Sequence, residues 1–202
     1  MSEHKFWEDR YAVPNYIFGE KPSEYLVSCQ SLLPKKGKAL AIADGEGRNG
    51  VWIAQQGLDV LSLDFSNNAQ QKAKDLASSM GVKINFEVAD VHTWNYPEKM
   101  FDLVVDIFSQ FSAPNDRFVK WSGMIKALKS GGLIIIQGYT PKQLIYATGG
   151  PKNEEQLYTK DILESMFSEF RNINIIEKEC ILNEGIAHSG MSAIICMTAF
   201  KK

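Results

Sequence analysis

The sequence predicts an α/β fold: a doubly wound, seven-stranded sheet that is mainly parallel, with helices on both faces. Segments typical of strands alternate five times with segments typical of helices. Two of those strands, 38–43 and 60–63, are apolar on nearly every residue, which is typical of parallel strands buried on both faces. The last two, 173–181 and 191–200, are joined by a link too short for a parallel crossover. They predict a C-terminal antiparallel hairpin that places one reversed strand near an edge.

The remaining elements follow from local patterns along the chain. Ser66 and Thr159 are natural N-caps, Asn49 can cap a third helix, and Gly57 and Gly81 are natural stops. The expected helices span 21–33, 49–57, 66–80, 115–128 and 159–170. The other expected strands span 82–88, 101–108 and 133–137. Residues 138–155 are expected to form a long irregular connection, which in a compact domain is often functional.

We expect residues 1–202 to form one domain, with an N-terminal part (1–33) and a core (38–200). The first half of the N-terminal part, residues 4–19, is rich in aromatic residues without a clear period, and Pro14 and Gly19 interrupt any regular element. This segment could be a lid over a site, or an arm that packs on the domain.

The stretch from Lys38 to Asp64 organises the chain: strand, glycine turn, helix, strand. Glycines in the turn let a ligand approach the backbone, and the helix N-terminus adds positive charge. Asp64 ends the second strand, where a carboxylate can accept hydrogen bonds from a ribose diol, and its spacing from Gly47 is close to the roughly 20 residues of that arrangement. The alternative is that the glycines only permit close helix–sheet packing.

Aspartates stand at the ends of the first four strands: Asp44, Asp64, Asp90 and Asp106. Each alone could cap the next helix or turn. Together they indicate a rim that contacts a polar, partly cationic ligand.

These features resemble class I S-adenosylmethionine-dependent methyltransferases over nearly the whole chain. DGEGRNG resembles the glycine-rich first motif, LSLDFS the second, VADVHTW the third, FDLVVDIF the fourth and LKSGGLIIIQG the fifth. FWEDRY and YIFGEKPSEYL, together with GRN, are similar to the small bacterial tellurite-resistance and thiopurine methyltransferase-like proteins. The resemblance implies a Rossmann-like core, S-adenosylmethionine as cofactor, and a small-molecule methyl acceptor such as a thiol, an amine or a metalloid oxyanion.

The resemblance also implies a set of cofactor-binding residues. It places Asp64 in the ribose slot, Asp90 near the adenine amino group and Val91 near the adenine ring, and it folds the N-terminal segment over the cofactor. The whole expected set is Arg10, Tyr16, Phe18, Ala43, Asp44, Gly45, Glu46, Gly47, Asn49, Asp64, Phe65, Ala89, Asp90, Val91, Asp106 and Ile107.

One departure from the family pattern lies in the first motif. Alanines, Ala41 and Ala43, replace its leading acid and first glycine. Ala43 would still allow close approach if its φ is negative, and Asp44 and Glu46 could supply acidic character near the cofactor's ammonium group.

The sequence contains no compelling catalytic motif, and methyl transfer by alignment does not require one. An amine or hydroxyl acceptor must lose a proton, whereas a thiolate or oxyanion need not. Candidates for contact with the acceptor are Tyr16, Gln110, Tyr139, Tyr146 and His188, although a lone loop histidine is most often solvated. We expect no metal, because no cluster has metal-ligand spacing.

Two other functions use part of the same pattern. A non-catalytic domain that holds the cofactor would fit the altered first motif. A nicotinamide-dependent oxidoreductase would use the glycine turn and Asp64, but neither the final hairpin nor Asp90.

Charge and cysteine content restrict partners and location. A net charge of −2 without a block of like charge argues against a nucleic-acid-binding surface. Cys29, Cys180 and Cys196 are widely spaced, which favours reduced thiols in a cytoplasmic protein. The charged N-terminus and the lack of a long apolar run indicate neither a signal peptide nor a membrane span. The sequence leaves open whether the protein is a monomer or a homodimer.

Overall fold

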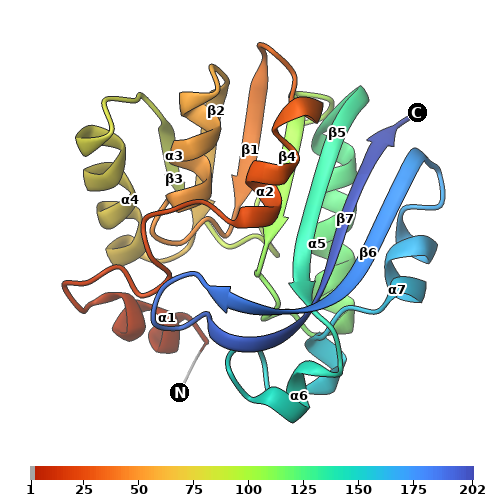
Figure 1. Cartoon of the computed structure of the whole chain (residues 1–202). Helices are drawn as coiled ribbons and strands as arrows, with labels where there is room; N and C mark the ends of the chain where they lie inside the picture. Colours follow the sequence, from red (N-terminus) through yellow and green to blue (C-terminus); the bar gives the residue numbers. More distant parts are fainter. Residues whose placement is uncertain (1–2) are drawn as a thin grey trace.

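The computed structural model describes residues 3–202, and within them one sheet of seven strands runs in the order β3-β2-β1-β4-β5-β7-β6 (Figure 1). The strands are β1 (Lys38–Ile42), β2 (Asp59–Asp64), β3 (Asn85–Val88), β4 (Phe101–Ile107), β5 (Leu128–Tyr139), β6 (Phe170–Asn183) and β7 (Ser189–Lys201). The helices are α1 (Glu3–Tyr11), α2 (Glu24–Ser28), α3 (Arg48–Gln55), α4 (Asn67–Ser79), α5 (Pro114–Ala127), α6 (Gln143–Tyr146) and α7 (Lys160–Met166). Short 3-10 turns occur at Gln30–Leu32 and Glu154–Gln156.

Strand pairing confirms the predicted fold class. The five strands from β3 to β5 pair in parallel, and β7 pairs antiparallel with both β5 and β6. The parallel strands therefore all end at one edge of the sheet. Figure 1 shows α1 and α6 at this edge, which is the lower edge in that view.

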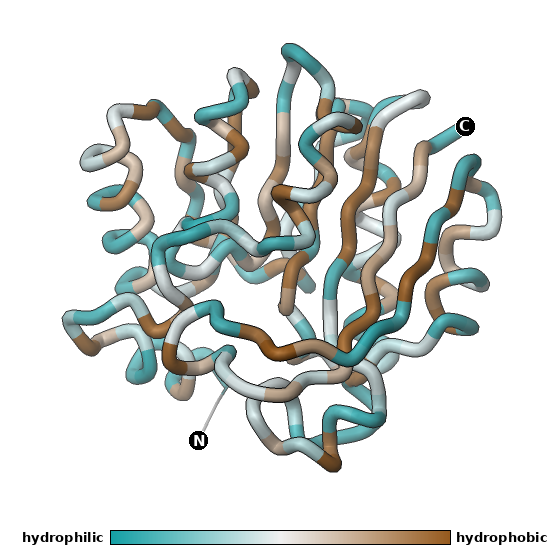
Figure 2. The backbone as a smooth tube through the Cα atoms, in the orientation of Figure 1, coloured by the Kyte–Doolittle hydropathy of each residue, from teal (hydrophilic) through white to brown (hydrophobic). Residues whose placement is uncertain are grey.

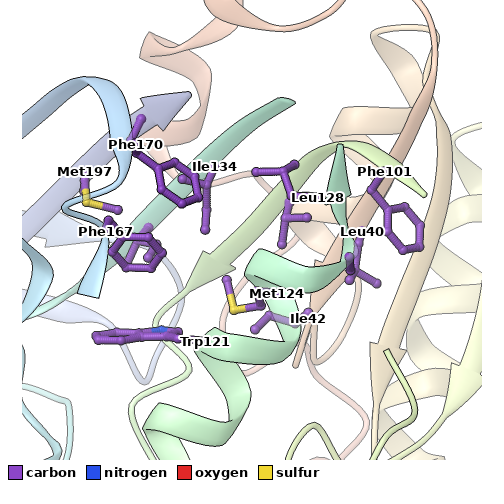
Figure 3. Close-up of a cluster of buried hydrophobic side chains, with 14 of the residues drawn as sticks. Leu40, Ile42, Phe101, Trp121, Met124, Leu128, Ile134, Phe167, Phe170 and Met197 are labelled. Atoms are coloured by element: carbon purple, nitrogen blue, oxygen red, sulfur yellow. The ribbon is translucent and has the colours of Figure 1, made fainter. Parts of the chain in front are cut away.

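Alternate residues of each central strand face opposite sides of the sheet, and each side has its own core. In β1, Leu40 and Ile42 pack toward α5 and α7, whereas Ala39 and Ala41 pack toward α2 and α3. Figure 3 shows the larger of these cores, in which Trp121 of α5 lies among the buried residues. Figure 2 shows hydrophobic stretches along the strands. Each fully buried large apolar side chain stabilises the fold by about 1.5–3 kcal/mol.

Two predicted N-caps are confirmed and one is wrong. Ser66 Oγ accepts from Ala69 N at 3.1 Å, and Thr159 caps α7 in the same way. The helix predicted to start at Asn49 instead begins at Arg48, after Gly47 in the left-handed region with φ 87°. Asn49 Oδ1 accepts from the backbone N–H of Ser23 at 3.0 Å, so its side chain fastens the entry to α2.

Other element bounds also differ from the prediction. The helix predicted over 21–33 is the short α2 followed by a 3-10 turn, and the helix predicted over 159–170 stops at Met166 because the chain turns into β6. β3 begins at Asn85 rather than Val82, since Val82 and Ile84 pack against α3 and α4 instead of pairing with β2. β5 starts early, because Leu128 already pairs with Phe101 across an irregular register. The connection after β5 contains α6.

Helix α1 lies in the segment for which no regular element was predicted. The carboxylate of Glu8 accepts from Ser66 Oγ and from Asn68 N at 3.3 Å, so α1 is fastened to the N-terminus of α4. No helix within residues 3–202 combines the length and apolar character that crossing a membrane requires.

Candidate active site

A narrow pocket lies at the edge where β1, β2 and β4 end. Its wall is made by the turn after β1, the ends of β2 and β4, the N-terminal segment and the β6–β7 turn. Ten predicted site residues line it: Phe18, Ala43, Asp44, Gly45, Glu46, Asn49, Asp64, Phe65, Ile107 and His188. The structure therefore brings most of the first two motifs together at one place.

The Asp64 carboxylate is held in position by the backbone on both sides. Oδ2 accepts from Gly45 N at 2.8 Å, and Oδ1 accepts from Ser66 N at 2.9 Å. Burial raises the pKa of Asp64 to about 6, and these two N–H groups oppose that rise. Each oxygen keeps a lone pair beyond the backbone bond, so the carboxylate can still accept from a ligand.

Asp44 is the second buried carboxyl of the pocket. Oδ1 accepts from Gly50 N at 3.1 Å and Oδ2 accepts from Ser62 Oγ at 2.8 Å. Burial raises the pKa of Asp44 to about 7, against the opposing effect of both hydrogen bonds. The group is therefore poised to ionise near neutral pH, and a cationic ligand would favour its charged form.

Glu46 and Ala43 differ from what the sequence suggested. The Glu46 carboxylate accepts from Ile17 N at 3.2 Å, Phe18 N at 3.1 Å and Lys72 Nζ at 2.8 Å, so it anchors the N-terminal segment. Ala43 has φ 44°, not the negative φ on which close approach was argued. The turn keeps a conformation that favours glycine although alanine occupies it, a strain of about 1–2 kcal/mol.

Gly47 serves packing rather than the pocket wall. A Cβ on Gly47 would lie 2.6 Å from Cβ and 2.8 Å from Cα of Ala73, so its absence lets α4 approach the turn. A Cβ on Gly50 would lie 2.4 Å from Asp44 Oδ2. At Gly47 and Gly50, therefore, the lack of a side chain permits close packing, which was the alternative to ligand binding.

The aspartates at the ends of β3 and β4 do not join the rim formed by Asp44 and Asp64. Asp90 is half exposed at its side chain, where Oδ1 accepts from His92 N at 2.9 Å. Asp106 is fully buried on the α5 side of the sheet, 3.3 Å from Lys120 Nζ. The predicted rim of four aspartates is therefore a pair in this structure.

Four other predicted cofactor residues also lie outside the pocket wall. Val91 is buried in the core on the α5 side, and Ala89 packs against it. Tyr16 donates its hydroxyl to the Lys72 carbonyl at 2.9 Å, away from the pocket. Arg10 lines a second cavity instead.

This second cavity is wider, with a volume of about 1140 Å³, and it adjoins the narrow pocket. Trp7, Phe18, Phe108, Phe111 and His188 line both. Of the proposed acceptor contacts, Gln110, Tyr139 and His188 lie on its wall. Tyr16 and Tyr146 do not; the Tyr146 hydroxyl donates to Glu179.

His188 is buried, in contrast to the solvated state that a loop histidine usually has. Its ring lies 4.6 Å from the Phe18 ring and 4.5 Å from the Phe108 ring, and only 6% of the residue is exposed. Burial lowers the pKa of His188 well below its usual value, and the charges of Arg48 and Arg10 lower it further. The imidazole is therefore neutral at pH 7, and its Nδ1 has no hydrogen-bond partner among residues 3–202.

A buried ion pair holds the turn that carries His188. Arg48 Nη2 lies 2.7 Å from Glu184 Oε2, with both side chains nearly inaccessible. Glu184 N donates to the His188 carbonyl at 2.9 Å, which closes the turn. Helix α3 thus fixes the position of the histidine through Arg48.

Sequence reasoning missed several residues of the pocket wall: Trp7, Tyr11, Arg48, Phe108, Ser109 and Phe111. Trp7 and Tyr11 could have been found as an i, i+4 aromatic pair, since their rings stack at 5.7 Å on one side of α1. Arg48 follows the glycine turn directly, but its partner Glu184 is too distant in sequence to be inferred.

Comparison with known proteins agrees with this architecture. Residues 39–132 match the family described as methyltransferase domain. Phosphoethanolamine N-methyltransferase 1 of Zea mays is 31% identical over 147 residues, which cover 70% of this chain and 27% of the relative. The chain spans about a quarter of the length of the curated relatives it matches.

Solved structures agree over the whole chain. A structure from work on the conversion of a disulfide bond into a thioacetal group during echinomycin biosynthesis has a TM-score of 0.80 at 16% identity and covers 100% of this chain and 93% of the other. TehB from Haemophilus influenzae has a TM-score of 0.70 at 16% identity, and the match covers 98% of this chain and 67% of the TehB chain. At this identity the two structures establish the fold.

Motifs, sheet topology and domain match together define a Rossmann-like methyltransferase domain. The domain match and the solved structures support a class I S-adenosylmethionine-dependent methyltransferase, as the sequence predicted, with S-adenosylmethionine as cofactor.

Proposed function

We propose that this chain transfers the methyl group of S-adenosylmethionine to a small-molecule acceptor. The observation that carries the proposal is the junction of the two cavities at His188, where a narrow pocket beside Asp64 opens into a wider one. Methyl transfer requires a donor and an acceptor held end to end in a site that excludes water. Two adjoining cavities with shared aromatic walls suit this requirement.

The residues of the narrow pocket fit the cofactor chemically. The lone pairs that Asp64 keeps beyond its backbone bonds suit a ribose diol, and Asp44 suits a neighbouring ammonium group. Phe65 and Phe111, with ring centroids 6.2 Å apart, offer apolar surface to a purine. Trp7, Tyr11 and Phe18 cover the pocket from the N-terminal side. The cofactor supplies a methyl group on a positively charged sulfur, and S-adenosylhomocysteine is left after transfer.

His188 is the residue best suited to remove a proton from the acceptor. As the acceptor nitrogen or oxygen bonds to the methyl carbon and the carbon–sulfur bond breaks, the acceptor releases one proton. A neutral imidazole at the junction can take it. Arg48 and Glu184 would act as positioning residues for the histidine. A thiolate acceptor would not need this base.

Calorimetric titration with S-adenosylhomocysteine tests cofactor binding. We expect micromolar affinity, about −8 kcal/mol, and none for NADH. Asp64→Asn should weaken binding because it loses a charged acceptor, whereas the matched control Asp59→Asn, at the exposed opposite end of β2, should bind as wild type does. Equal affinity of Asp64→Asn and wild type would contradict the site assignment, and no binding by wild type would overturn the function.

A screen for S-adenosylhomocysteine formation tests turnover. Acceptors should include thiols, amines, phenols and phosphoethanolamine, the last because it appears in the name of the plant relatives. With an amine or phenol, His188→Asn should lower kcat by about 10²–10⁴-fold and lower cofactor affinity much less. Tight binding without turnover on any acceptor would favour the non-catalytic alternative.

Location is proposed on separate grounds. Cys29, Cys180 and Cys196 are all free thiols, and two of them are buried. Unpaired cysteines support a reducing compartment, in line with a cytoplasmic location.

A further inference from the structure

The wide cavity is strongly aromatic. Its wall includes rings from three parts of the chain, and the rings are those of Phe6, Trp7, Phe18, Phe108, Phe111 and Tyr139. Flat aromatic ligands pack well against such surfaces, with each ring pair contributing about 0.5–1.5 kcal/mol beyond area burial. The cavity is therefore shaped for a flat apolar body rather than for a small hydrated ion.

The charges on the cavity wall are mainly positive. Arg10 and Lys152 line it, and Glu3 is the acidic residue on the wall. The neutral state of His188 adds no charge. An anion entering this cavity meets an excess of cationic groups.

Arg10 is held in place by rings rather than by a carboxylate. Its guanidinium carbon lies 5.2 Å from the Trp7 ring centroid, 5.5 Å from that of Phe18 and 5.8 Å from that of Phe6. Among residues 3–202, no acidic group lies within ion-pair distance of Arg10, although most buried or half-buried cations of this chain have such a partner. A guanidinium fixed by stacking keeps its donor fork for a carboxylate or phosphate.

We infer that the methyl acceptor is an aromatic anion, bound in the wide cavity with its carboxylate or phosphate at Arg10 and its ring among the aromatic side chains. The inference rests on the proposed function, because it names the substrate class of the same site. Since Phe18 contacts both Arg10 and His188, an acceptor held at Arg10 lies beside the shared wall of the two cavities.

Calorimetry with simple probes tests this inference. Benzoate, phenyl phosphate, methyl phosphate and benzamide are titrated into the full chain, with and without saturating S-adenosylhomocysteine. We expect benzoate or phenyl phosphate to bind about tenfold more tightly than benzamide, and phenyl phosphate about tenfold more tightly than methyl phosphate, each equivalent to ~1.4 kcal/mol. Whichever of benzoate and phenyl phosphate binds more tightly identifies the anionic group, carboxylate or phosphate, that the site prefers.

Arg10→Gln should abolish the preference for the anion while leaving S-adenosylhomocysteine affinity within about twofold of wild type. Arg171→Gln is the matched control, because this exposed arginine lies near the start of β6 and does not line the cavity; it should leave every affinity unchanged. If Arg10→Gln weakens S-adenosylhomocysteine instead of the anions, Arg10 serves the cofactor and the inference fails.

Two further results separate this inference from the proposed function. Equal affinity of wild type for benzoate and benzamide, or no binding of any aromatic probe, would overturn the inference while cofactor binding stands. Absence of S-adenosylhomocysteine binding would overturn the proposed function, and the anion preference measured without it would still report on Arg10.

Discussion

Replacing Lys120 with Met would remove one half of a fully buried ion pair. Lys120 Nζ lies 3.3 Å from Asp106 Oδ2, and both side chains are 0% exposed. Nζ also donates to the Ser109 carbonyl at 2.9 Å and to Ser109 Oγ at 2.7 Å. In the variant, Asp106 keeps the hydrogen bonds from Trp121 Nε1 and Ser109 but no cation within ion-pair distance among residues 3–202.

The expected loss of stability follows from the short distance between Lys120 and Asp106 and from their burial. At 3.3 Å and an effective dielectric constant of about 20, the attraction is about 5 kcal/mol. Removal of one partner from a buried pair costs about 3–5 kcal/mol, because the other charge is left uncompensated. For a chain of 202 residues this lowers Tm by roughly 6–20 °C.

Urea unfolding with a constant m value measures this loss. Lys129→Met is the matched control: Lys129 pairs with Asp102 at 2.8 Å but is 42% exposed, so its loss should cost about 1 kcal/mol or less. The double variant Lys120→Met/Asp106→Asn removes both charges of this pair and should recover about half of the lost stability or more. A cost below about 1 kcal/mol for Lys120→Met, or no recovery in the double variant, would refute the reasoning.

Further predictions test the glycine turn, a buried carboxyl and the fastening of α1. Gly47→Ala should lower the free energy of unfolding, measured in urea, by about 2–5 kcal/mol, because Gly47 has a positive φ and an added Cβ would lie 2.8 Å from the Cα of Ala73 in α4. The control Gly81→Ala, also at positive φ but with nothing within 4 Å of the added Cβ, should lower it by about 1–2 kcal/mol. Burial raises the pKa of Asp44 to about 7, so the folded state holds a proton that the unfolded state loses near pH 4; the stability from this group is present at low pH and lost as pH rises through 7. Asp44→Asn should therefore reduce the fall in stability between about pH 5 and pH 8 by about 2–3 kcal/mol, and an unchanged pH profile would contradict the raised pKa. Glu8→Gln should speed hydrogen exchange in α1, since Glu8 binds the N-terminus of α4, whereas Asp9→Asn, which breaks an exposed ion pair with Lys5 within the helix, should have a smaller effect.

The strands were predictable because each is encoded locally. In β1, β4 and β5 the buried residues form nearly unbroken apolar runs, and the short link before β7 fixes an antiparallel pairing. The glycine turn and Asp64 were predictable because strand, turn and helix follow one another within 27 residues, Lys38 to Asp64. These features need no knowledge of distant contacts.

Helix α1 could not be predicted, because it depends on other parts of the chain. Its sequence EHKFWEDRY has little amphipathic character. Glu8 binds α4, and Tyr11 packs on the glycine turn, where its hydroxyl would lie 2.9 Å from a Cβ on Gly45. The burial of His188 likewise comes from rings on three separate segments.

Asp106 was misplaced at the rim for a reason that strand geometry supplies. Residues two apart on a strand share a face, so Asp106 points the same way as Val104, toward α5. Val105 and Ile107 point to the other face and line the narrow pocket. The amino-acid sequence does not indicate which of the two alternating sets of β4 side chains faces the ligand.

Charged residues in the turn after β1 and at the start of α3 explain how segments from the two ends of the chain come to cover one pocket. Glu46 binds the backbone of Ile17 and Phe18, and Arg48 pairs with Glu184 in the β6–β7 turn. The N-terminal segment and the β6–β7 turn, which cover the pocket, also bind each other, since Ala187 N donates to the Ile17 carbonyl at 3.0 Å. Glu46 and Arg48 therefore hold the walls of the site in place. The backbone of the turn and the Asp64 carboxylate are left available to bind the ligand. Substitution of Glu46 or Arg48 should accordingly weaken cofactor and acceptor binding together, because it would release covers that both cavities share.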